Sequence, residues 1–148
     1  MGKVLIAYYS RTGSTERMTE YIAEGIRFSG QQVVVKKVSD IKNADELAGY
    51  DGYLFGSPTY YLDIAEPVKR FLFLAQQAEL EGKPAGAFGS YSHDGNAPGI
   101  VLDTMQYVFK MEPFELGPFK LKEATLETVE GMRSCQDYGK VFGEKLNS

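Results

Sequence analysis

The sequence predicts an α/β protein whose central sheet is parallel and covered by helices on both faces. Two observations carry this prediction. Short runs rich in β-branched and aromatic residues occur along the whole chain, and segments with apolar residues every three or four positions separate them. Strands separated by helices form parallel sheets, because each helix carries the chain back to the start of the next strand.

Five segments are expected to be strands, and helical patterns separate and follow them. The expected strands are Lys3–Tyr9, Gln32–Val38, Gly52–Gly56, Pro84–Ser90 and approximately Phe114–Leu121. The apolar repeats of the expected helices run over residues 18–26, 44–50, 64–75, 98–110 and 132–146. Pro67 fits only in the first turn of its helix. Ligands of such sheets bind beyond the carboxyl ends of the strands, which directs attention to the loops after the first, third and fourth strands.

The composition is that of one ordinary globular domain over residues 1–148. Hydrophobic residues make up 43% of the chain and charged residues 24%. The net charge of −4 argues against a nucleic-acid partner, and no apolar run is long enough for membrane insertion. Cys135 has no second cysteine to pair with, so we expect a cytoplasmic protein. We also expect a monomer, with a dimer as the open alternative, and neither a metal site nor a catalytic residue.

The segment after the first strand has the features of a phosphate site. Ser10–Thr15 contains four hydroxyl side chains and Gly13, and a helix begins near Ser14. The unpaired N–H groups of a first helical turn and the positive end of the helix dipole attract an anion. The loop lacks the lysine of a nucleoside-triphosphate loop and the glycine triplet of a dinucleotide loop, so a single terminal phosphate fits best. A simple helix cap remains the alternative for this segment taken alone.

The loops after the third and fourth strands combine aromatic rings with small residues. They are Gly56–Asp63 and Gly89–Gly99. Tyrosine rings can stack on a flat heterocycle while main-chain N–H and C=O groups contact its edge. For each tyrosine alone, a half-buried ring with its hydroxyl in water is the alternative. Together with the phosphate loop, the two loops indicate a phosphorylated planar cofactor, for which FMN is the natural candidate.

In these three loops the chain resembles the flavodoxin family. The motifs are Ser-Arg-Thr-Gly-Ser-Thr-Glu from Ser10, Gly-Ser-Pro-Thr-Tyr-Tyr from Gly56 and Phe-Gly-Ser-Tyr from Phe88. The resemblance covers essentially the full length and includes the last helix, with Cys135 and Gly139. It implies a flavodoxin-like, doubly wound five-stranded parallel sheet in the order 2-1-3-4-5, with helices on both faces. It also implies FMN bound tightly but noncovalently.

The resemblance assigns cofactor-binding residues in each loop. Those expected around the phosphate are Ser10, Arg11, Thr12, Gly13, Ser14 and Thr15. Those expected around the ring are Ser57, Pro58, Thr59, Tyr60 and Tyr61 in the second loop, and Ser90, Tyr91, His93, Asp94 and Gly95 in the third. For Arg11 and His93, a side chain that faces solvent is equally compatible with the pattern.

A flavodoxin is a low-potential electron carrier, so the resemblance implies redox partner proteins that dock transiently at an exposed flavin edge. Asp63 and Asp94, if close, would repel the reduced ring, and Glu66 would lie near the rim with them. Leu62 and Ile64 would lie beside them at the rim, or else pack under the loop. In many flavodoxins a glycine after the third strand supplies a hydrogen bond to the one-electron-reduced ring, and Tyr61 occupies that place here. We therefore expect this state to be less stabilised than in those relatives.

The same motifs are also similar to those of the flavodoxin-like NAD(P)H:quinone oxidoreductases and of the flavodoxin module of flavodiiron proteins. The quinone reductases favour two-electron chemistry and are usually longer, and the flavodiiron module is normally fused to a metal domain. This chain shows no second glycine-rich motif for a nicotinamide cofactor. An electron carrier is therefore the preferred interpretation. Two-electron quinone reduction is the alternative, and whether the protein is an enzyme stays open.

Overall fold

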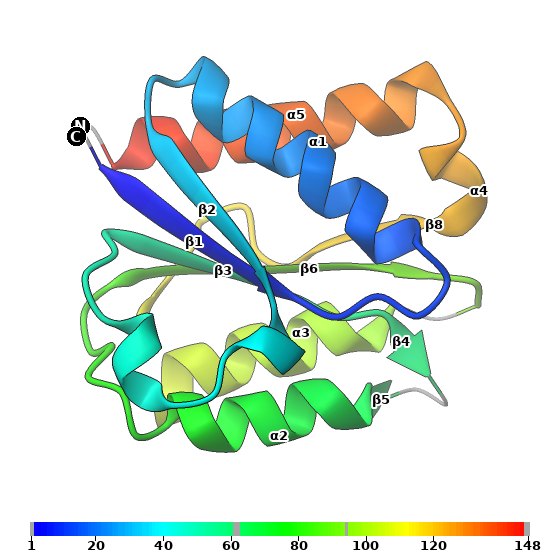
Figure 1. Cartoon of the computed structure of the whole chain (residues 1–148). Helices are drawn as coiled ribbons and strands as arrows, with labels where there is room; N and C mark the ends of the chain where they lie inside the picture. The colour runs from blue at the N-terminus through cyan, green and yellow to red at the C-terminus, as the bar shows by residue number, and fades with distance from the viewer. Residues whose placement is uncertain (1, 61–62, 94, 147–148) are drawn as a thin grey trace.

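The computed structural model describes residues 2–60, 63–93 and 95–146 and has three layers (Figure 1). A parallel sheet forms the middle layer. Helices α1 (Ser14–Phe28) and α5 (Val129–Lys145) cover one face of the sheet, and α2 (Glu66–Ala75) and α3 (Asn96–Asp103) cover the other. The predicted α/β architecture with helices on both faces is confirmed.

The sheet brings the carboxyl ends of its three central strands to the same edge. Its order is β2 (Gln32–Lys37), β1 (Lys3–Tyr8), β3 (Gly52–Gly56), β6 (Pro84–Tyr91), with β7 (Glu112–Pro113) and β8 (Phe119–Lys122) both beside β6. All of these pairs are parallel. Tyr8 lies opposite Gly56, and Gly56 lies opposite Phe88. This is the predicted order, except that two short strands share the fifth position.

The fifth strand differs from the predicted Phe114–Leu121. Its pairing is divided between β7 and β8: the Phe114 N–H still donates to the Ala85 carbonyl of β6 over 2.7 Å, and residues 115–118 belong to neither strand. The Gly117 N–H donates to the Phe114 carbonyl over 2.9 Å, which turns the chain away from β6. Pro118, which follows this turn directly before β8, has no N–H group to donate to a ladder.

Several short elements also differ from the prediction. The helix expected at 44–50 is a 3₁₀ turn over Ala44–Leu47, and the helix expected at 98–110 is α3 followed by a π-helical turn over Thr104–Val108. The hairpin of β4 (Thr59–Tyr60) and β5 (Asp63–Ile64), and helix α4 (Glu123–Leu126), have no counterpart in the prediction. Elements of two to four residues are too short to set a periodic pattern.

Two apolar cores lie on opposite faces of the sheet. Because side chains alternate along a strand, β1 sends Val4 and Ile6 toward α1 and α5, and Leu5 and Ala7 toward α2 and α3. Cys135 of α5 is fully buried in the first core, and burial raises the pKa of its thiol to about 12. Within the described ranges, no helix is both long and apolar enough to cross a membrane.

Helices α1 and α5 touch through their backbones at two glycines. A Cβ atom at Gly25 would lie 1.9 Å from the carbonyl oxygen of Gln136, and one at Gly139 would lie 2.1 Å from that of Ile22. Neither overlap can be relieved unless the helices move apart. Since α1 begins directly after the first loop, this contact fixes where the helix N-terminus lies at the edge of the sheet.

We expect Gly139→Ala to lower the free energy of unfolding by about 1–3 kcal/mol, because the added methyl group would overlap the Ile22 carbonyl. Gly99→Ala is the matched control: Gly99 also lies in a helix, but no heavy atom lies within 4 Å of its Cβ position. There the better helix propensity of alanine should raise stability by up to about 1 kcal/mol. Urea unfolding followed by circular dichroism measures both. Equal stability of the two variants would contradict the close-contact interpretation.

Candidate cofactor site

Three loops leave the sheet side by side, at the edge where β1, β3 and β6 end (Figure 1). The parallel ladder continues one residue past each strand. The Tyr9 N–H donates to the Gly56 carbonyl over 3.1 Å, and the Ser57 N–H donates to the Phe88 carbonyl over 3.0 Å. The first, second and third loops of the sequence prediction therefore start from adjacent points.

The first loop turns directly into the N-terminus of α1. Gly13 is the N-cap residue and has φ +94°, a left-handed conformation that side chains rarely adopt. Its N–H donates to the Ser10 hydroxyl over 3.1 Å, and its carbonyl accepts the Arg17 N–H over 3.0 Å. The N–H groups of residues 14–16 lie in the first turn, where a helix offers them no carbonyl. This end of the helix can therefore hold an anion.

The predicted phosphate residues do not all face solvent. Arg11, Thr12 and Gly13 are exposed, whereas Ser10 and Ser14 are half-buried. Thr15 is 1% exposed, and its hydroxyl lies 2.8 Å from the hydroxyl of Ser90, which is equally buried. These two hydroxyls join the start of α1 to the end of β6. The first and third loops are thus tied together in the protein interior.

The second loop runs into the β4–β5 hairpin, in which Thr59 pairs with Ile64 and Tyr60 with Asp63. The fully buried Ser57 donates its hydroxyl to the Pro58 carbonyl over 2.9 Å and accepts the Ala65 N–H over 3.4 Å. Pro58 is also buried. The hydroxyl of Ser57 therefore joins the start of the second loop to its end, on the buried side of the loop. The Tyr60 side chain and residues Tyr61 and Leu62 lie outside the described part of the chain.

The third loop contacts the second at the start of α3. The Ala97 N–H donates to the Thr59 hydroxyl over 2.9 Å. Gly95 is the N-cap residue of α3 and is buried, Tyr91 is half-buried, and His93 is exposed. Asp94 lies outside the described residues. The structure thus brings all three predicted loops together, with one hydrogen-bonded link between the first and third and another between the second and third.

Two of the charged residues expected near the ring are paired with cations. The Lys69 ammonium lies 2.7 Å from the Asp63 carboxylate, and the Arg70 guanidinium lies 3.6 Å from Glu66. The hydrogen bond from Lys69, followed by that from the Ile64 N–H, lowers the pKa of Asp63. The expected repulsion from Asp63 is therefore offset by its partner. Ile64, in strand β5 of the hairpin, is buried, which agrees with the alternative that it packs under the loop and not with a place at the rim.

Sequence analysis missed Glu123, the first residue of α4. Its carboxylate accepts hydrogen bonds from the Thr12 hydroxyl over 3.5 Å and from the Ser92 hydroxyl over 3.3 Å. Glu123 thus places a negative charge between the first and third loops. No local signal could have shown this, because 111 residues separate it from Thr12.

A second missed contact lies behind the first loop. The Tyr8 hydroxyl donates to the Glu16 carboxylate over 2.6 Å. Burial, and then the adjacent carboxylate, raise the pKa of Tyr8, so this group remains a neutral donor. A polar cavity of about 320 Å³ opens beside the pair, between Arg11 and Lys37. The Tyr8 hydroxyl holds Glu16 in place in the first turn of α1.

The arrangement has counterparts among known proteins. A family model described as a flavodoxin domain matches residues 5–113. A flavodoxin from Clostridium saccharobutylicum is 34% identical over 103 residues, which cover 70% of this chain and 64% of that protein. A flavodoxin from Maridesulfovibrio salexigens is 38% identical over 97 residues, which cover 64% of this chain and 66% of that protein. The chain thus spans slightly less than two thirds of the length of these curated relatives.

Structural similarity extends over the whole fold. The solved structure of a flavodoxin from the domain Archaea superposes with a TM-score of 0.87 and 28% sequence identity, and the match covers 99% of both chains. The likeness therefore continues beyond residue 113, through β8 and α4 to the last helix.

We expect Glu123→Gln to tighten FMN binding by roughly two- to fivefold, because the change removes a negative charge next to a loop that would hold a phosphate. Glu127→Gln is the control with the same charge change. Glu127 pairs with Arg17 over 3.1 Å, and its side chain is 72% exposed. Removal of its charge should therefore change the affinity for FMN by less than about twofold. Quenching of flavin fluorescence measures both affinities. If Glu123→Gln binds FMN more weakly than the wild type, the hydrogen bonds of Glu123 to Thr12 and Ser92 contribute more to FMN affinity than its negative charge takes away.

Proposed function

The chain belongs to the flavodoxin family, and from that membership we propose that it carries electrons between redox partner proteins on a noncovalently bound FMN. One observation carries the proposal. The N-terminus of α1 and the loops after β3 and β6 are tied together at one edge of the sheet by the Thr15–Ser90 and Thr59–Ala97 hydrogen bonds. Such an arrangement would suit a cofactor with a phosphate at the helix N-terminus and a flat ring between the other two loops.

The residues present fit FMN. The N–H groups of residues 14–16 would bind its phosphate, and the hydroxyls of Ser10, Thr12 and Ser14 lie in the same loop to add further donors. The second loop, from Ser57, and the third loop, from Ser90, would form the two walls around the ring. Tyr91 is half-buried and offers an aromatic face there. When bound, FMN supplies the redox chemistry by accepting and releasing electrons on its ring.

The protein's part is to hold the ring and to set the charge around it. Burial of Ser57, Pro58 and Ser90 keeps the base of the site out of water. The pairing of Asp63 with Lys69 and of Glu66 with Arg70 leaves this part of the rim close to neutral. Docking of a redox partner should therefore depend only modestly on salt. We further infer that the protein acts as a monomer in the cytoplasm, which suits a carrier that visits several partners.

We expect the apoprotein to bind one FMN and to bind riboflavin roughly 100-fold more weakly or worse, since charge-assisted hydrogen bonds to the phosphate each contribute about 1.5–3 kcal/mol. Calorimetric titration with the two compounds measures the ratio. Equal affinities would contradict the assignment of the phosphate to the first loop, and uptake of neither compound would contradict the function.

The same preparation distinguishes a carrier from an enzyme. We expect the FMN-loaded protein to show no sustained turnover when NADPH and a quinone are added without a partner protein, because the proposed carrier receives its electrons from other proteins. Absorbance of NADPH measures this, and the rate with free FMN is the control. Fast turnover by the pure protein would favour the two-electron quinone reductase instead.

A further inference from the structure

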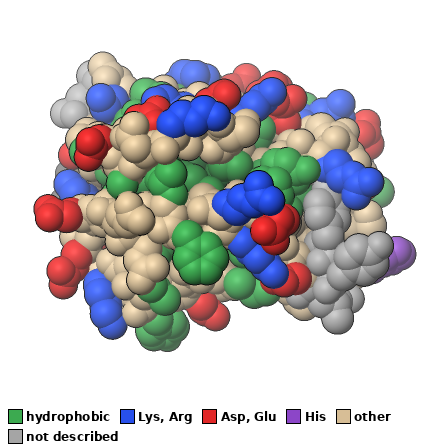
Figure 2. All heavy atoms as spheres, turned by 60° about the horizontal axis from the view of Figure 1, so that its bottom comes forward, with side chains coloured by type: hydrophobic (Ala, Val, Ile, Leu, Met, Phe, Trp, Pro, Cys, Tyr) green, Lys and Arg blue, Asp and Glu red, His purple; other side chains and the backbone are tan. Residues whose placement is uncertain are grey.

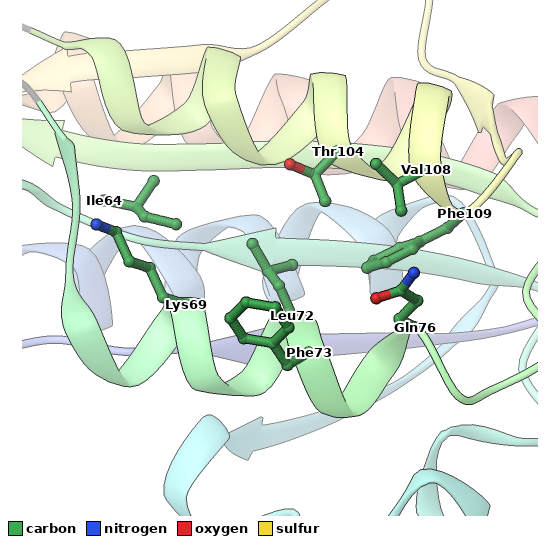
Figure 3. Close-up of a pocket in the computed structure, with 8 residues that line it drawn as sticks. All are labelled: Ile64, Lys69, Leu72, Phe73, Gln76, Thr104, Val108 and Phe109. Carbon is green, nitrogen blue, oxygen red and sulfur yellow. The ribbon is translucent and has the colours of Figure 1, made fainter.

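An apolar groove runs between α2 and the turn Thr104–Val108, on the face of the molecule that Figure 2 shows. Its volume is about 360 Å³, and its buried apolar lining is Ile64, Leu72 and Phe109. One end of the groove lies under the β4–β5 hairpin at Ile64. Figure 3 shows the Lys69 side chain rising from α2 toward Ile64, away from the end formed by Val108 and Phe109.

At that end, Lys69 of α2 forms an ion pair with Asp63 of the β4–β5 hairpin. Its ammonium lies 2.7 Å from one carboxylate oxygen of Asp63, and the other oxygen accepts the Ile64 N–H over 2.7 Å. Both side chains are about half exposed, at 42% and 44%. A neighbouring pair, Arg70–Glu66, lies within α2 and does not reach the hairpin; it is longer, at 3.6 Å, and its side chains are 80% and 66% exposed. Lys69 is therefore the cation held most closely to the hairpin.

Asp63 is the last residue of the second loop, which is expected to border the FMN ring. FMN that has taken up two electrons carries a negative charge on its ring at neutral pH. An unpaired carboxylate on the hairpin would raise the free energy of that state and so lower the midpoint potential. A cation bound to the carboxylate removes most of this effect.

We propose that Lys69 is a positioning residue that neutralises Asp63 and thereby sets the reduction potential of FMN in this protein. The inference rests on the proposed function. A purely mechanical role is the competing explanation, because the same ion pair also ties the hairpin to α2. The two roles predict different signs for the effects of single substitutions.

The experiment compares midpoint potentials of the FMN-loaded protein and its variants by spectroelectrochemistry at low salt. We expect Lys69→Met to lower the potential and Asp63→Asn to raise it. The double variant, which has the same net charge as the wild type, should return close to the starting value. Lys69→Arg should retain the wild-type potential. Each single substitution should change the ratio of the affinities for reduced and oxidised FMN by a factor on the order of two to five.

Arg70→Met is the matched control, since it removes the same charge one residue further along α2 from a looser and more exposed pair. Its shift should be clearly smaller than that of Lys69→Met. Two readouts do not depend on redox chemistry. Binding of oxidised FMN should stay within about twofold in all variants, and NMR titration of the apoprotein should show the pKa of Asp63 returning toward its ordinary value in Lys69→Met.

A shift of the same sign in both single variants, or a loss of affinity for oxidised FMN in both, would show that the pair is a brace and would overturn the inference. An Arg70→Met shift as large as that of Lys69→Met would overturn it as well. Failure of the wild-type protein to bind FMN would overturn the proposed function together with this inference. The expected pattern of opposite signs with recovery in the double variant establishes the electrostatic role.

Discussion

The buried hydrogen bond between Thr15 and Ser90 is the interaction on which the site depends. Both hydroxyls are withdrawn from water, and the Thr15 hydroxyl also accepts the Ser90 N–H over 3.4 Å, so removal of the Thr15 hydroxyl would leave the Ser90 hydroxyl unsatisfied. The bond fixes the first turn of α1 against the end of β6, while the glycine contact of α1 with α5 holds the same helix from behind. The loop with the free N–H groups and the loop with the half-buried Tyr91 therefore keep a fixed separation before any ligand arrives.

Most of the sheet could be predicted from sequence because its four longest strands carry a strong and simple signal. β1, β2, β3 and β6 are runs of apolar residues, and each predicted range agrees with the structure to within one residue at either end. The fifth strand could not be placed correctly, because Phe114 and Leu116 continue an apolar pattern into the turn at Gly117, where the chain leaves β6. Apolar character predicted burial there, and Phe114 is indeed buried, but the turn divides the backbone pairing between two short strands.

The location of the candidate site could also be predicted, whereas the hydrogen bonds that join its loops could not. Parallel topology alone places the loops after β1, β3 and β6 together, so the hydroxyl-rich and tyrosine-rich segments had to meet. The contacts that tie them, Thr15 with Ser90 and Glu123 with Thr12, join residues 75 and 111 positions apart, and no local pattern encodes such pairs. The charges of Asp63 and Glu66 were visible in the sequence, and so was the i,i+4 spacing of Glu66 and Arg70 on one helix. The pairing of Asp63 with Lys69, across the start of α2, became apparent only in three dimensions.

The burial of Cys135 has a practical consequence for spectroscopy. Thiol-directed dyes and spin labels react with the thiolate, and a fully buried thiol with a pKa of about 12 supplies almost none at neutral pH. A cysteine introduced at an exposed position such as Phe73 on α2 would thus be labelled selectively, without prior replacement of the native one. The protein is in effect ready for single-site labelling, and motion of α2 relative to the sheet can be followed in an otherwise unaltered chain.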